Sequence, residues 1–154
     1  MNNRPFIFVA FVLFAILSSC SDYKEVSDSK FIGTWELTGR SMFDGMKIKI
    51  EKKSNNSFTG KIVELNDNKF VKMFADSNDV WVSDIKRTSN FQFKITEKRI
   101  GRQLFALYEL GTSDTYKVEF IDDDSFGLAE GSTDPLKSDV IYKRIKDKHL
   151  ETQK

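Results

Sequence analysis

Cysteine and histidine are almost absent from this chain. Among 154 residues there is one cysteine, Cys20, and one histidine, His149. A single cysteine excludes an intrachain disulfide and a thiolate zinc site, and His149 falls in a charged tail over residues 147–154. A Ser-His-Asp or Cys-His arrangement therefore lacks its members in the folded domain. We accordingly expect no enzyme activity, no cofactor and no metal site.

An excess of charge of one sign is also lacking. Lysine and arginine total 24, aspartate and glutamate total 23, and the formal net charge is +1. Domains that bind nucleic acid normally present a basic face, so we expect no nucleic-acid partner. The hydrophobic content of 40% is ordinary for one globular domain of this length, and fourteen phenylalanines indicate an aromatic-rich core.

Long apolar runs are limited to one segment near the N-terminus. Residues 6–17 are apolar without interruption, and they follow a short polar start that contains Arg4. A membrane-spanning helix needs about 20 such residues, which is longer than this run. The charged start, the apolar middle and the small residues Ser18 and Ser19 are typical of an export signal peptide over residues 1–19.

The end of this segment carries a more specific pattern. Residues 17–20, Leu-Ser-Ser-Cys, resemble the lipobox of bacterial lipoproteins. The resemblance implies that the Cys20 thiol is acylated with chains such as palmitate, that the signal is removed, and that residues 20–29 form a lipidated tether to a membrane. Ser21 is not the retention aspartate, so we expect a cell-envelope location at the outer membrane, with the periplasmic and surface faces both open. An ordinary secretory signal and an N-terminal membrane helix are the alternatives.

Alternation with a period of two dominates the domain over residues 30–146. Met46, Ile48 and Ile50, for example, alternate with charged residues, which indicates a strand with one dry and one wet face. Turn signals rich in Asn, Asp, Ser and Gly separate such runs, and no amphipathic helix is predicted. The ten candidate strands lie near 31–40, 45–53, 57–65, 69–75, 79–87, 90–98, 103–110, 114–121, 125–130 and 139–146.

Strands at this spacing favour an all-β fold. The choices are a closed, antiparallel up-and-down barrel of about 8–10 strands and a two-sheet sandwich. Closure is favoured because it removes the exposed edges of a long antiparallel sheet. Residues 104–110 are apolar on both faces, so this segment is expected to pack inside the barrel and also to lie under a loop or the tether.

The two ends of the domain carry a family resemblance. Gly33-Thr34-Trp35 resembles the Gly-x-Trp signature of lipocalins and of lipocalin-like lipoproteins of Bacteroidota type. The resemblance implies a lipocalin-like barrel over residues 30–146, in which Gly33 permits a short turn and Trp35 closes the barrel floor. It also implies that Arg144, in the last strand, packs over the indole, a contact worth about 0.5–2 kcal/mol.

This fold leaves two functions open. A barrel that its own side chains do not fill binds a small hydrophobic ligand, usually at the open end. A filled barrel would instead act as a protein-interaction, inhibitor or immunity-type lipoprotein with an envelope protein partner. That second reading predicts an exposed apolar patch, for which Trp81 is a candidate if it points outward.

Five further residues are candidate contacts at the barrel mouth or surface. Met42 and Phe43 are apolar in a predicted loop, where they would gate the barrel or fold inward over it. Lys98, Arg99 and Arg102 surround a predicted turn at 101, as a solvated hairpin tip or as a contact for anionic lipid headgroups.

Replacing Cys20 tests the anchor. In Cys20→Ser no thiol remains to be acylated, so labelled palmitate should not be incorporated and the protein should no longer carry the acyl anchor. Metabolic labelling followed by electrophoresis measures this directly. Ser18→Ala keeps a small residue in the lipobox and should remain labelled. Label on Cys20→Ser, or a precursor insensitive to globomycin, would contradict the assignment.

Overall fold

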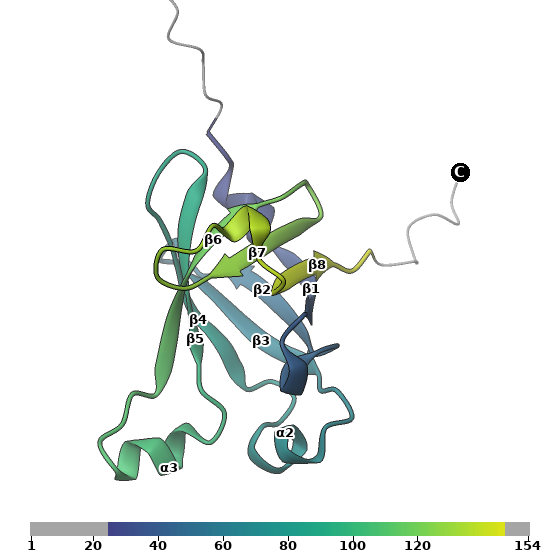
Figure 1. Cartoon of the computed structure of the whole chain (residues 1–154), viewed down its shortest axis with the longest axis vertical. Helices are drawn as coiled ribbons and strands as arrows, with labels where there is room; N and C mark the ends of the chain where they lie inside the picture. Colours follow the sequence, from purple (N-terminus) through teal and green to yellow (C-terminus); the bar gives the residue numbers. More distant parts are fainter. Residues whose placement is uncertain (1–24, 147–154) are drawn as a thin grey trace, which may run out of the picture.

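The computed structural model describes residues 25–146, which form a closed antiparallel barrel of eight strands (Figure 1). Each strand pairs with the next one along the chain, and the last pairs with the first. The strands are β1 (Gly33–Thr38), β2 (Lys47–Lys52), β3 (Phe58–Glu64), β4 (Val80–Arg87), β5 (Gln92–Lys98), β6 (Ser113–Phe120), β7 (Ser125–Ala129) and β8 (Ile141–Arg144). The predicted all-β, up-and-down barrel is confirmed, and the pairing of β8 with β1 excludes the sandwich. The predicted signal peptide, Cys20 and the charged tail lie outside the described residues.

Short helices occupy five positions in the described chain. They are η1 (Asp28–Phe31), η2 (Ser41–Phe43), α2 (Lys69–Phe74), α3 (Arg102–Leu107) and η3 (Pro135–Lys137). The first precedes the barrel, and the other four lie in the β1–β2, β3–β4, β5–β6 and β7–β8 connections. These four connections leave the barrel at the same end, because successive connections alternate between its ends, and η3 then folds back onto β6 and β7 (Figure 1).

The prediction of a strand over 69–75 is wrong, since α2 covers most of it. The Asn68 side-chain oxygen accepts hydrogen bonds from the N–H groups of Phe70 (2.9 Å) and Val71 (3.3 Å), which caps the helix. Val71 is fully buried and Phe70 is largely exposed. A helix of six residues makes fewer than two turns, so its period does not show in the sequence.

The prediction of a strand over 103–110 is also wrong. Gly101 adopts a left-handed conformation with φ of 71°, and α3 follows it. No β-branched residue occurs from 101 to 110, whereas Arg, Gln, Leu and Ala favour helices. Leu107 and Tyr108 are 77% and 76% exposed, so this part of the segment lies on the surface and not inside the barrel.

The folded part of the chain begins earlier than the predicted boundary at residue 30. The Val26 N–H donates to the Asn90 carbonyl oxygen at 2.8 Å, and Arg87 donates to the Val26 carbonyl oxygen at 2.6 Å. Arg87 also forms ion pairs with Glu25 and Asp28. The polar composition of residues 25–29 predicts a tether, but these contacts hold the segment on the barrel.

Aromatic side chains fill the interior at the end of the barrel where η1 lies, which we call the closed end. Phe31 from η1 is fully buried, and its ring centroid lies 4.9 Å from Phe93, 4.8 Å from Phe120 and 5.3 Å from Phe126. Trp35 adds a contact at 4.7 Å from Phe126. Edge-on and tilted pairs at these separations are favourable beyond the area that they bury. The closed end therefore has a dense core of its own.

The Gly-x-Trp signature lies at the closed end with Arg144. The Arg144 guanidinium carbon is 4.1 Å from the Trp35 ring centroid, and its two terminal nitrogens donate to the carbonyl oxygens of Ile32 (2.9 Å) and Lys30 (2.6 Å). Gly33 has φ of 138°, and a Cβ there would lie 2.6 Å from the Arg144 Nη1. The backbone conformation therefore favours glycine at position 33, and a larger residue would also have to displace the guanidinium. This is the arrangement that the lipocalin resemblance implies.

Truncating the buried ring should be costly. Phe31→Ala removes contacts with several phenylalanines and leaves a cavity, so the free energy of unfolding should fall by about 3–5 kcal/mol. Urea denaturation followed by circular dichroism measures the change. Phe91, at the same end, is 44% exposed, and Phe91→Ala should cost less than about 1 kcal/mol. Equal losses in the two variants would argue against the closed-end core.

Candidate ligand site at the open end of the barrel

The end of the barrel opposite η1, which we call the mouth, is built from the longer connections. Figure 1 shows α2 and α3 at this end, away from the N-terminal segment. Several large apolar side chains of the mouth are exposed: Met42, Phe70, Met73, Phe74, Leu107, Tyr108 and Leu110. Apolar side chains gathered on one end of a barrel mark a surface that contacts something other than water.

A hollow of about 410 Å³ opens at the mouth. Its volume is in the range of small-molecule sites. Its apolar wall consists of Met42, Phe43, Phe70, Phe74, Trp81, Ile100 and Phe105, from η2, α2, β4, α3 and the residues beside them. The ring centroids of Phe43 and Trp81 are 5.2 Å apart in an edge-to-face contact, so Phe43 folds inward.

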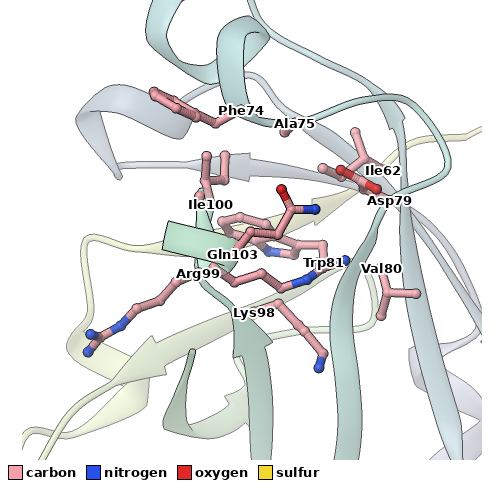
Figure 2. A pocket seen from close by; sticks show the side chains of 12 residues that line it. Ile62, Phe74, Ala75, Asp79, Val80, Trp81, Lys98, Arg99, Ile100 and Gln103 are labelled. Atoms are coloured by element: carbon pink, nitrogen blue, oxygen red, sulfur yellow. The ribbon is translucent and has the colours of Figure 1, made fainter. Parts of the chain in front are cut away.

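A smaller hollow of about 50 Å³ adjoins the first between α2 and the start of α3. Phe74, Trp81 and Ile100 line both hollows, so the two share a wall. Figure 2 shows these side chains around the smaller hollow, with the Gln103 amide directed into it. The Lys98 ammonium points away from it, so Lys98 contributes its aliphatic stem.

A chain of buried polar groups forms the floor of the larger hollow. The Glu97 carboxylate is 2% exposed and accepts hydrogen bonds from Arg40 Nη1 (2.5 Å) and from the Tyr142 hydroxyl (2.5 Å). The Trp81 indole N–H in turn donates to the Tyr142 oxygen at 2.8 Å. A buried carboxylate is tolerable only when it is paired and hydrogen-bonded in this way. These four side chains separate the filled core from the hollow.

Burial and the Glu97 carboxylate shift the ionisation of the floor. Burial raises the pKa of Tyr142 well above its usual value, and the charge of Glu97 raises it further. Burial lowers the pKa of Arg40, but the charge and hydrogen bond of Glu97 outweigh it and give a net rise. At neutral pH the Tyr142 phenol is therefore neutral and the Arg40 guanidinium is charged.

A second ion pair lines the side of the hollow. Arg99 donates from Nε and Nη2 to the two carboxylate oxygens of Asp114, at 2.8 and 2.6 Å. These hydrogen bonds hold the pKa of Asp114 below its usual value. The Arg40 guanidinium lies over the Tyr116 ring, 4.7 Å from its centroid, and Arg99 lies 5.8 Å from that of Phe105. Both arginines are thus fixed by a carboxylate and a ring.

Two other hollows help to place the site. One of about 200 Å³ lies beyond Arg40 and Tyr116, with Glu130, Thr133 and Ser138 in its lining. Another, of about 450 Å³ at the closed end, is lined by Glu25, Ser27, Asp28, Ser29, Lys52 and Arg87. Among the described residues it offers no apolar side chain to a ligand, so the mouth is the better candidate.

The residues singled out from the sequence fall into two groups. Met42 and Phe43 line the hollow at the mouth, as does Arg99. Lys98 lines both hollows and Arg102 lines the smaller one. Gly33, Trp35 and Arg144 lie together at the closed end, remote from the ligand site. Cys20 and His149 lie outside the described residues.

The structure decides two alternatives that the sequence leaves open in this region. Trp81 does not point outward, since it is 3% exposed and bonded to Tyr142. The turn at Gly101 is not a hairpin tip, because it leads into α3. Arg99 is paired with Asp114, which compensates its charge but leaves part of its guanidinium without a hydrogen-bond partner among the described residues. The basic stretch is therefore part of the mouth and its wall.

Sequence reasoning missed most of the floor and the ring wall. Arg40, Glu97 and Tyr116 were not singled out, nor was the ring of Phe105. One signal was available: Phe93, Ile95 and Glu97 share the inward parity of β5, so alternation alone places the Glu97 carboxylate inside the barrel. For Arg40 the partner is 57 residues away, and no local pattern identifies it.

Comparisons with known proteins add no relative. No protein-family model, curated protein or solved structure matches this chain. Within residues 25–146, no helix is long and apolar enough to span a membrane. The same residues contain no group of three or more His, Cys, Asp or Glu side chains placed to hold a metal ion.

The Tyr142 phenol predicts a loss of stability in alkali. In the unfolded chain it ionises near pH 10, whereas in the folded protein its raised pKa keeps it neutral. Its contribution is therefore complete below about pH 10 and is lost as pH rises from there towards the folded pKa, by up to about 1.4 kcal/mol per pH unit. Urea unfolding at a series of pH values measures this slope.

Tyr142→Phe should decline less steeply above about pH 10 than the wild type, because it lacks this titration. At pH 7 it should be less stable by about 1–3 kcal/mol, since Glu97 loses a donor. Tyr108→Phe, at an exposed tyrosine, should retain the wild-type slope. An unchanged slope in Tyr142→Phe would exclude this origin of the pH dependence.

Proposed function

We propose that this chain is a lipid-anchored lipoprotein of the bacterial cell envelope, with a lipocalin-like barrel that binds a small hydrophobic ligand at its mouth. The hollow of about 410 Å³ is the observation that carries the proposal. Its walls are phenylalanines that expose apolar surface to water when no ligand is present. Burial of that surface would supply most of the binding free energy.

The sequence leaves open whether the barrel is filled by its own side chains or has room for a ligand, and the position of the hollow is compatible with both. The abundant phenylalanine fills the closed end, around Phe31, and leaves the mouth open above Glu97. The site is therefore shallow and suits a compact molecule or part of a longer one. Its polar groups are held in ion pairs and hydrogen bonds, which favours a role in binding over one in catalysis.

The proposed anchor fits this arrangement. Cys20 precedes Glu25, the first described residue, by five positions, so the chain between them reaches at most about 18 Å. The chain joins the barrel at the closed end, next to Asn90. A barrel tethered there presents its mouth away from the anchoring membrane, at the outer membrane on whichever face the protein occupies.

An envelope protein partner is the second candidate function. Leu107 and Tyr108 are strongly exposed and do not line either hollow at the mouth. Such side chains suit a protein contact beside the hollow, as in an inhibitor or immunity-type lipoprotein. The two functions differ in which residues they need.

Two exposed phenylalanines test the ligand site. The chain from Ser21 onward retains every described residue, including the closed core, and should take up a fluorescent fatty acid. The double variant Phe70→Ser with Phe74→Ser should bind it at least about tenfold more weakly, because two large rings of the apolar wall are lost. Fluorescence titration measures affinity, and circular dichroism checks folding.

Phe91→Ser is the matched control, since Phe91 is as exposed as Phe74 but lies at the other end of the barrel. It should bind like the wild type. Absence of uptake by the wild type, together with no apolar mass in native mass spectra of protein from its host, would reject the ligand hypothesis. Leu107→Ser with Tyr108→Ser should retain ligand binding but would lose a protein partner, if that is the function.

A further inference from the structure

The charged groups that face the larger hollow cancel in pairs. Arg40 is bonded to Glu97 at 2.5 Å, and Arg99 to Asp114 at 2.6 Å. Lys98 also lines the hollow, but it is the last residue of β5 and belongs to the outward parity of that strand, next to the inward Glu97. The floor and side of the hollow are therefore electrically balanced, although they are rich in charge.

Hydrogen-bond donors remain available in this balanced site. A guanidinium has five N–H donors. Among the described hydrogen bonds, Arg40 uses only its Nη1 and Arg99 uses Nε and Nη2. Both side chains line the hollow. Among the described residues every fully buried polar side-chain atom has a hydrogen-bond partner, so the guanidinium nitrogens that lack one are not fully buried. The remaining N–H groups are thus accessible to water or to a ligand.

Charge balance weighs against a ligand that carries a full charge. A carboxylate placed on Arg40 or Arg99 would also lie close to Glu97 or Asp114, so attraction and repulsion would act over comparable distances. The ligand would still lose its hydration. A cationic head group would be attracted by the two carboxylates but repelled by the two guanidiniums over comparable distances. An uncharged head with oxygen acceptors avoids this cost and can accept the free N–H groups.

We propose that the mouth binds an uncharged amphiphile, with a hydroxyl-, ester- or amide-bearing head on Arg40 and Arg99 and a hydrocarbon part against the phenylalanines of α2 and α3. This inference rests on the proposed ligand-binding function and specifies its ligand class. The hollow of about 200 Å³ beyond Arg40 and Tyr116 gives room for a head larger than one hydroxyl. Thr133 and Glu130 in its lining offer polar groups to a polyhydroxyl head such as glycerol, whereas the Ser138 hydroxyl is already bonded to the backbone of Leu128 and Val140.

A series of head groups on one hydrocarbon chain tests the proposal. Monolauroylglycerol, laurate and lauryltrimethylammonium are titrated below their micelle concentrations into the chain from Ser21 onward, by calorimetry. The glyceride should bind at least about tenfold more tightly than either ion. Laurate binding as tightly as the glyceride would overturn this inference and leave the proposed function standing. Failure of all three, and of the fluorescent fatty acid, would overturn both.

Neutralising one carboxylate should change the preference in a defined direction. Asp114→Asn leaves the charge of Arg99 unbalanced, so laurate should bind at least about threefold more tightly while the glyceride changes less than twofold. This ion pair is about one-third exposed, which makes the substitution tolerable for the fold. Glu97→Gln should act in the same direction on Arg40, provided that circular dichroism shows a folded barrel.

Glu51→Gln is the matched control. Glu51 is also paired, with Lys49 at 2.8 Å, but it lies on β2, outside the lining of the hollow. It changes the net charge by the same amount and should leave both affinities within twofold of the wild type. An equal gain in laurate affinity in Glu51→Gln and Asp114→Asn would mean that overall charge, and not the balance at the mouth, sets the preference.

Discussion

The buried Glu97 carboxylate is the constraint on which the mouth depends. It stands inside a closed barrel, where an unpaired charge would be very unfavourable, and it is compensated by Arg40 and Tyr142. Arg40 follows β1, Tyr142 belongs to β8, and Trp81 on β4 completes the chain of hydrogen bonds. One carboxylate therefore ties together four separate stretches of the barrel. It also sets the level at which apolar packing ends and the hollow begins.

In the described part of the chain, the closed end is stabilised by aromatic packing and not by buried ion pairs. There the barrel is filled by rings, with Phe31 at the centre of a cluster and Trp35 packed on Phe126. Arg144 lies across the Trp35 indole and donates to the backbone of the segment that leads into β1. The packed aromatic core and the hollow thus occupy different halves of one barrel. The exposed apolar side chains are concentrated where packing is least complete, on the short helices of the mouth.

The barrel itself could be predicted because its strands carry a clear signal. Ile48 and Ile50 alternate with lysine and glutamate, and the turn residues mark where each strand ends. The helices α2 and α3 could not be predicted, since six residues are too few to show a helical period. The motif of Gly33 and Trp35 led to Arg144 because a family pattern joins the ends of the chain. No such pattern leads to Arg40, whose position over Tyr116 and next to Glu97 depends on how distant strands meet.

The layer formed by Arg40, Glu97, Tyr142 and Trp81 has an evolutionary consequence. Below it, the inward-facing side chains are packed in the core, and substitutions there would threaten folding. Above it, α2 and α3 are short surface elements that carry several exposed apolar side chains, although Val71 is buried. Mutations at the exposed positions of these two connections can accumulate with little penalty to the scaffold. Descendants of this chain would therefore be expected to share their buried rings and to diverge in what they recognise.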